Sequence, residues 1–157
     1  MAKKLILITF IWLVGFAMGN AFWYLASPLW IDRVVSESLP QGAALTALAT
    51  GQFRDADAAH KGRGVATLYQ ETGGARRVAL TEFQVTNGPD LQVYLVEAGE
   101  VGSAEDVLAS RWVSLGALKG NIGDQSYRLP DNPGFEVGSV VIWCEQFSVL
   151  FSAARLK

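Results

Sequence analysis

Two residues of this chain have side chains suited to redox or nucleophilic chemistry, its one cysteine, Cys144, and its one histidine, His60. Cys144 lies in a strand-like apolar run from Val140 to Phe151, and the chain begins with an apolar segment typical of exported proteins. An exported protein with a single cysteine has no partner for an internal disulfide. Cys144 is therefore a buried apolar side chain, an intermolecular linker or a redox-active thiol, and the last of these requires partial exposure and a thiolate.

His60 lies in a polar loop sequence and has three alternative roles. It could accept a proton from Cys144, bind a metal together with Asp55 or Asp57, or bond to the backbone of its own loop. A closed structural zinc site needs about four ligands, which one histidine and one cysteine do not supply. The glycines lack the strand–turn–helix context of a nucleotide site, and no Gly-x-Ser-x-Gly elbow is present. We therefore expect no metal and no cofactor, and redox or binding chemistry rather than a hydrolase or transferase.

The N-terminal segment predicts a membrane anchor over residues 1–27. Lys3 and Lys4 precede an uncharged run, of which Leu5 to Ala26 is 22 residues. As a helix these residues span about 33 Å, close to the hydrocarbon core of a bilayer. The two lysines favour a cytoplasmic N-terminus, so we expect a single-pass protein of the cell membrane with an extracytoplasmic C-terminal domain. The alternative is a cleaved signal peptide, with small-residue cleavage sites around Gly19.

Residues 28–50 predict a helical stalk or linker, and residues 51–157 a single domain. Ser27-Pro28 is a typical helix start, and Ile31, Val34, Val35 and Leu39 recur at helical spacing. Beyond the two N-terminal lysines the chain carries eleven basic and fifteen acidic side chains. Because no dense basic patch is present, nucleic acid is excluded as a partner.

The domain itself predicts an all-β fold, an antiparallel β-sandwich. Short alternating runs are separated by turn residues about every dozen positions, which is typical of sandwiches. A change of phase near Thr81-Glu82 indicates a bulge, and another at Glu145-Gln146 would align Cys144 with Phe147. Ser103 predicts a short capped helix, with Asp106 as the capping-box acid. Gly88-Pro89-Asp90 predicts a tight turn in which Gly88 takes a positive φ. Seven aromatic residues are expected in the core, namely Phe83, Tyr94, Trp112, Tyr127, Trp143, Phe147 and Phe151.

Several motifs occur in one order along the whole domain: Gly64-x-Ala66-x-Leu68, Gly88-Pro89-Asp90-Leu91, Gly123-Asp124-Gln125-x-Tyr127 and Trp143-Cys144-x-x-Phe147. Together they resemble the DM-thirteen domain, a small β-sandwich module described as an electron-transfer domain. The resemblance implies electron transfer beside DOMON-type haem-binding sandwiches, with Cys144 as the proposed redox centre. This sequence has no such haem-binding domain, so its partner would be a separate envelope redox or haem protein.

On this interpretation Cys144 cycles between a thiol and an oxidised form, Trp143 and Phe147 frame the site, and His60 assists as a base. Asp90 either accepts backbone N–H hydrogen bonds within its turn or holds a cation at the rim of the sandwich. The alternative is a non-catalytic module that binds a ligand or an envelope protein. Its contact surface would be the loops from Arg54 to Gly64 and from Leu118 to Gln125.

Overall fold

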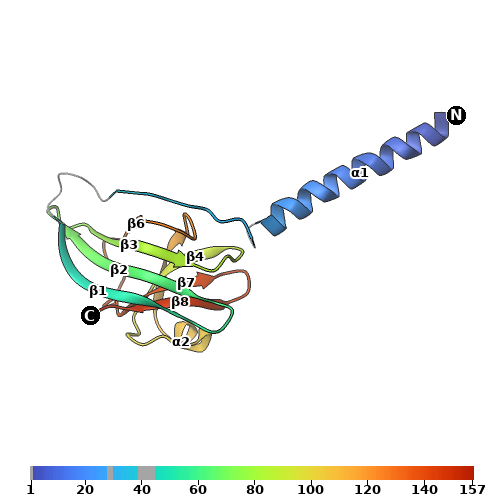
Figure 1. Ribbon diagram of the computed structural model, residues 1–157. Helices are drawn as coiled ribbons and strands as arrows, with labels where there is room; N and C mark the ends of the chain where they lie inside the picture. Colours follow the sequence, from blue (N-terminus) through green and yellow to red (C-terminus); the bar gives the residue numbers. More distant parts are fainter. Residues whose placement is uncertain (1, 28–29, 39–44) are drawn as a thin grey trace. The chain divides into compact units, whose positions relative to one another are not determined.

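The computed structural model describes residues 2–27, 30–38 and 45–157 and divides into two units, Met1–Ile31 and Asp32–Lys157 (Figure 1). The first unit is one helix, α1 (Ala2–Ala26). Its span Ala2–Tyr24 has a mean hydropathy of 2.1 and is long and apolar enough to cross a membrane. The helix expected from the uncharged run is therefore present, and its length is consistent with an anchor.

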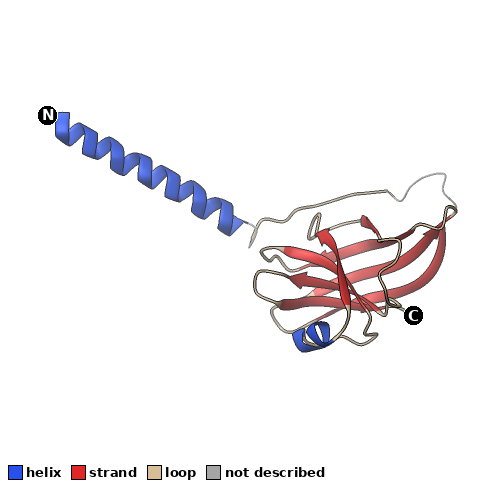
Figure 2. Cartoon of the chain, turned by 180° about the vertical axis from the view of Figure 1, so that it is seen from behind, coloured by secondary structure: helices blue, strands red, loops and turns tan. Residues whose placement is uncertain are grey.

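Within its described residues, the second unit contains eight strands and one short helix, and every pair of neighbouring strands is antiparallel (Figures 1 and 2). The strands are β1 (Leu45–Asp55), β2 (Gly62–Glu71), β3 (Arg76–Val85), β4 (Leu91–Val96), β5 (Trp112–Ala117), β6 (Gln125–Arg128), β7 (Ser139–Cys144) and β8 (Val149–Arg155), and the helix is α2 (Ala104–Ala109). Their order is β5-β4-β7-β8-β1-β2-β3-β6. The predicted antiparallel β fold is confirmed.

Strand β1 joins the two halves of the sheet. Its residues Leu45 to Gln52 pair with β2, whereas Phe53 to Asp55 pair with β8. One long strand thus takes part in both layers, and the sheet folds over a single apolar core between them. Alternation along β7 directs Ile142 and Cys144 into that core and Trp143 into a second cluster, which packs with Val107 of α2. The capping box expected at Ser103 and Asp106 begins α2.

Residues 32–38, here called the strap, are extended and belong to the second unit. The expected helical stalk is wrong for these residues, because their backbone bonds to the loop before β6 rather than to itself. Val35 N–H donates to Ile122 O (2.9 Å) and Glu37 N–H donates to Asp124 O (2.8 Å). Leu39 and the predicted helix end near Pro40 lie outside the described residues. Leu45 to Thr50, also assigned to the stalk, form the start of β1.

Polar side chains fix the strap at both ends. The buried Asn121 accepts the Arg33 N–H (2.6 Å) through its amide oxygen and donates to the Asp32 carboxylate (2.8 Å). At the other end the Glu37 carboxylate accepts from Lys119 Nζ (2.7 Å) and from the Ser126 N–H (2.9 Å). Hydrogen bonds from Lys119 lower the pKa of Glu37. The strap is thus an integral part of the folded domain.

One of the two expected bulges is present where the sequence placed it. Arg63 pairs with Gln84 and Val65 with Thr81. Gly64 therefore lies opposite two residues of β3, Glu82 and Phe83, and Glu82 takes a φ of 49°. The bulge expected at Glu145-Gln146 is wrong, because residues 145–148 are the turn of the β7–β8 hairpin. The extra residue of that hairpin is Phe151 on β8.

Candidate functional site

Cys144 is the last residue of β7 and is 1% exposed. It pairs with Leu91 of β4 and with Val149 of β8, so strands flank it on both sides. Its thiol donates to the carbonyl oxygen of Pro89, with 3.1 Å between Sγ and oxygen. The next N–H, of Glu145, donates to Asp90 O (3.2 Å). The β3–β4 connection (residues 86–90) therefore lies directly over the thiol, and we call it the cap.

The cap contains a glycine because a side chain would have no room there. A Cβ on Gly88 would lie 2.5 Å from Cζ of Phe151 and 3.1 Å from a methyl carbon of Leu91. The expected positive φ belongs instead to Asp90, at 51°, and not to Gly88. The connection is present as predicted, but Gly88 does not take a positive φ. Gly88 is required because a side chain would collide with Phe151, and the positive φ that turns the chain is that of Asp90.

Asp90 uses its side chain within the cap. Its Oδ1 accepts a hydrogen bond from Nε2 of Gln92 (2.9 Å), and the residue is exposed. In the part of the chain that the structure describes, no three His, Cys, Asp or Glu side chains are grouped to hold a metal. The turn-stabilising role of Asp90 thus has direct geometric support, whereas a ligand at Asp90 stays a prediction.

His60 is held in its loop by Asp57. The imidazole Nδ1 lies 2.7 Å from Asp57 Oδ2, and Asp57 Oδ1 accepts the backbone N–H groups of Ala59 and His60 (2.7 Å each). These bonds, from the His60 side chain first, lower the pKa of Asp57 to about 2. The imidazole also packs against Phe151, with ring centroids 4.3 Å apart. A carboxylate bound to one ring nitrogen fixes the imidazole tautomer and orientation.

Phe151 connects these groups. Its ring contacts His60 and occupies the space beside Gly88, whose neighbour Pro89 accepts the thiol hydrogen bond. The structure thus brings His60, the cap and Cys144 to one rim of the fold, but His60 and Cys144 share no hydrogen bond. Phe151 was expected only as a core residue, and the bulge that positions it gave no separate signal in the sequence.

Trp143 does not face the thiol, and a framing role for Phe147 stays a prediction. Trp143 faces the second cluster, on the side of β7 opposite Cys144. Phe147 lies on the hairpin turn and is 62% exposed, so it is not a core residue as expected. Trp112, also expected in the core, is 45% exposed. Sequence reasoning also missed the hydrogen bond from Tyr94 to Glu145, because it joins β4 to the turn of the β7–β8 hairpin, far away in the sequence.

The model of a protein family described as "Electron transfer DM13" matches residues 52–156. The chain belongs to the DM13 family. Comparisons with curated proteins and with solved structures found no match. The DM13 match includes the cap, the rim and Cys144, and it leaves out α1 and the strap. Membership confirms the resemblance derived from the motifs and supports a redox role for the domain.

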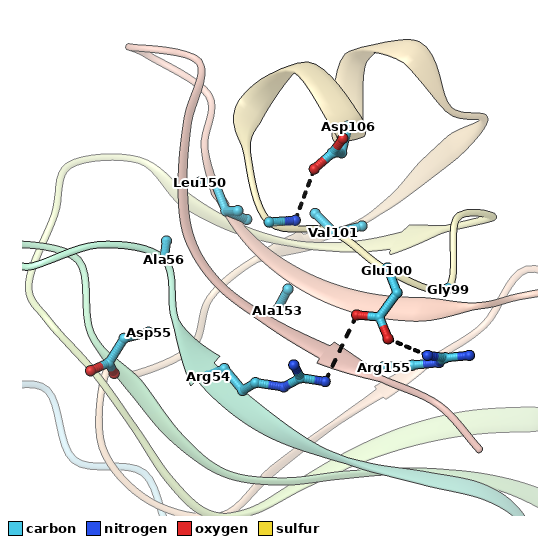
Figure 3. A pocket seen from close by; sticks show the side chains of 11 residues that line it. Arg54, Asp55, Ala56, Gly99, Glu100, Val101, Asp106, Leu150, Ala153 and Arg155 are labelled. Carbon is cyan, nitrogen blue, oxygen red and sulfur yellow. Dashed lines mark hydrogen bonds and ion pairs between the residues drawn. The ribbon is translucent and has the colours of Figure 1, made fainter.

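The DM13 domain also carries a pocket of about 350 Å³ beside the end of β1 (Figure 3). In it the Glu100 carboxylate lies between the guanidinium groups of Arg54, at 3.9 Å, and of Arg155. The segment from Arg54 to Gly64, predicted as a contact surface, therefore contributes Arg54, Asp55 and Ala56 to this pocket. The second expected contact loop, Leu118 to Gln125, already binds the strap.

Proposed function

We propose that this DM13 protein is a single-pass, extracytoplasmic electron-transfer module in which Cys144 is the redox centre. The family's description supports the electron-transfer role. The apolar α1 carries Lys3 and Lys4 in its first turn, which supports anchoring with the domain outside the cytoplasm. The observation that carries the choice of residue is the position of Cys144 at the end of β7, where its thiol bonds to the Pro89 carbonyl of one short connection.

The proposed reaction is thiol–disulfide exchange with a separate envelope redox protein. The Cys144 thiolate attacks one sulfur of the partner's disulfide, a mixed disulfide forms, and the partner's other sulfur leaves as a thiolate. A thiolate of a second molecule that carries two thiols then attacks Cys144 Sγ and releases the partner as a dithiol. The other thiolate of that molecule closes its own disulfide and restores the Cys144 thiolate, so two electrons pass from the second molecule to the partner. With no second cysteine in the chain, this resolving thiol must come from another molecule.

His60 is suited to take the proton that the thiol loses. Asp57 binds Nδ1 and so leaves Nε2 as the nitrogen that accepts a proton. Because Cys144 is buried and bonded to Pro89, the exchange requires the cap to open, which separates the thiol from the carbonyl and admits the partner. Local opening of this kind costs less free energy than unfolding the domain. Phe147 and Asp90 would contact the partner only as parts of the surrounding surface, whereas Trp143 is buried on the other side of β7.

Thiol labelling of the full chain in nanodiscs tests the redox centre. We expect Cys144 to react under native conditions at a rate that is independent of low denaturant concentrations and rises with pH as thiolate forms. A Cys144→Ala, Gln146→Cys variant supplies a matched reference thiol on the exposed hairpin turn. Labelling of Cys144 that follows global unfolding across all denaturant concentrations would overturn its role as the redox centre.

The topology has its own test. Protease added to intact cells should cleave the DM13 domain and leave α1 with the membrane. Protection of the domain in intact cells, with cleavage after permeabilisation, would place it in the cytoplasm and overturn the extracytoplasmic assignment.

The burial of Cys144 favours a second candidate, a non-catalytic module that binds a ligand or an envelope protein. Its surface would include the pocket between Arg54, Glu100 and Arg155. Cys144→Ser separates the two candidates. If Cys144 is the redox centre, the Cys144→Ser variant folds but no longer exchanges electrons with its partner. If the domain is a binding module, the same variant folds and still cross-links to its partner.

A further inference from the structure

Three aromatic rings from three adjacent strands form one stack on the side of the sheet away from Cys144. The ring centroid of Tyr94 on β4 lies 4.6 Å from Trp112 on β5, with 14° between the ring planes. It lies 6.2 Å from Trp143 on β7, with 29° between the planes. Trp112 and Trp143 are diagonal neighbours of Tyr94, since Trp112 pairs with Val96 and Trp143 with Gln92. The register of the sheet therefore fixes the stack.

The stack reaches from the interior to the surface. Tyr94 is 3% exposed and Trp143 is equally enclosed in the second cluster, whereas Trp112 is 45% exposed. Tryptophan and tyrosine are the side chains whose aromatic rings lose an electron most readily. Electron transfer between rings falls steeply with their separation, so stacked rings conduct better than isolated ones. Trp112 is the member that a second protein can contact.

Tyr94 has a proton acceptor at its hydroxyl. Its O–H donates to Oε1 of Glu145 (2.7 Å), which lies on the exposed turn of the β7–β8 hairpin. Burial and this carboxylate raise the pKa of Tyr94, so the phenol is protonated at physiological pH. A neutral phenol that loses an electron becomes a strong acid and must release its proton. Glu145 is placed to receive it at hydrogen-bond distance.

Tyr127 shows that this arrangement is not general to buried tyrosines of the domain. Its hydroxyl donates to the amide oxygen Oε1 of Gln125 (2.7 Å) and accepts from the Lys119 N–H (2.9 Å). An amide oxygen is too weak a base to take the proton of an oxidised phenol, whereas a carboxylate accepts a proton from a strong acid. Tyr127 is therefore a matched buried tyrosine without a base.

We propose that Trp112, Tyr94, Trp143 and Glu145 form a one-electron redox site that exchanges electrons with a one-electron carrier at Trp112. On oxidation, Tyr94 gives one electron through Trp112 to the carrier and its phenolic proton passes to Glu145. The products are a neutral Tyr94 radical, a protonated Glu145 and a carrier reduced by one electron. A one-electron donor reverses the step. The site goes beyond the proposed thiol chemistry because it needs no cysteine.

Flash oxidation of the full chain in nanodiscs tests the site, with photogenerated tris(bipyridine)ruthenium(III) as the probe. The starting protein carries Tyr24→Phe and Tyr69→Phe, so that Tyr94 and Tyr127 are its remaining tyrosines. We expect electron paramagnetic resonance of quenched samples to show a tyrosyl radical that persists in Tyr127→Phe and is lost in Tyr94→Phe. Each variant keeps its ring, and a thermal melt confirms the fold. A signal that survives Tyr94→Phe would overturn the proposal.

Two further variants test the proton acceptor and the surface contact. Glu145→Gln keeps an acceptor oxygen but not a base, so radical formation should slow by roughly 10²-fold, the lower range for a positioned proton acceptor. Trp112→Phe should slow it as well, because phenylalanine is harder to oxidise. An unchanged rate in either variant would overturn the assignment. Cys144→Ser should leave the radical unchanged, so failure of the thiol centre and failure of this site are separate results.

Discussion

The imidazole of His60 packs against the phenyl ring of Phe151, with 4.3 Å between ring centroids, and that same ring fills the space a Cβ on Gly88 would need. Phe151 reaches this position because it is the extra residue of a bulge. Trp143 pairs with Leu150 and Ile142 with Ser152, so Phe151 has no partner on β7. One side chain thus supports both the histidine loop and the cap over Cys144, which makes the rim a single packed unit.

The contact between Gly88 and Phe151 predicts strong coupling between these positions. Gly88→Ala should destabilise the domain by about 1–3 kcal/mol, the cost of overpacking a filled site. In a Phe151→Leu background the same change should cost less, because the shorter side chain leaves room for the methyl group. Denaturant unfolding of the two single variants and the double variant measures the coupling. Strictly additive free energies would show that Phe151 does not exclude the Cβ.

The Asp57–His60 pair predicts a pH dependence at acid pH. Its hydrogen bonds hold the pKa of Asp57 at about 2, below the ordinary 3.8. The carboxylate therefore adds stability above its unfolded-state pKa, and this contribution is lost as the pH falls from about 4 to about 2. The difference in unfolding free energy between wild type and Asp57→Asn should shrink over that window. If the two pH profiles run parallel there, the pair adds no stability in solution.

Two glycines with a left-handed backbone, Gly123 and Gly134, should differ in how much a substitution destabilises the domain, because only Gly123 lies against the strap. Gly123 (φ 101°) carries the strap, since a Cβ there would collide with Val35 O, whereas Gly134 (φ 83°) has open space around its Cβ position. Gly134→Ala should cost about 1–2 kcal/mol, the strain of a left-handed residue alone. Gly123→Ala should cost more and should raise hydrogen exchange at Val35 and Glu37. Equal costs and unchanged exchange would mean that the strap does not depend on this close approach.

Asp90 offers a third comparison, because it turns the cap at a φ of 51°. Asn tolerates this region and keeps an acceptor for Gln92, so Asp90→Asn should change the stability by less than about 0.5 kcal/mol. The β-branched Asp90→Val should cost about 1–2 kcal/mol. Thermal melts of both variants measure the difference. A neutral Asp90→Val would show that the cap is free to relax.

Local patterns predicted most of the domain. The apolar run of β7 and the alternation of β4 define their bounds as Ser139–Cys144 and Leu91–Val96, and the capping box begins α2. The bulge at Glu82 followed from a change of phase within one strand. Each of these signals comes from residues close together in the chain, where strand alternation and capping act.

The parts that sequence analysis missed depend on contacts between distant segments. The strap has helical spacing, but the carbonyl groups of Ile122 and Asp124 take its N–H groups and hold it extended. Phe147 continues the alternation of the neighbouring strands, yet the hairpin turn directs it to solvent. The partner of Cys144 could not be predicted either, because Pro89 reaches the thiol only when the cap folds onto the end of β7.

The strap also determines how much of the chain must be kept for the domain to fold. The DM13 match begins at residue 52, inside β1, whereas the compact unit begins at Asp32. A fragment cut at the family boundary would lose the pairing of Leu45 to Gly51 with β2 and would leave Lys119 and Ser126 without the Glu37 carboxylate. The unit of homology is therefore smaller than the unit of folding, and a soluble form of this protein should start at Asp32.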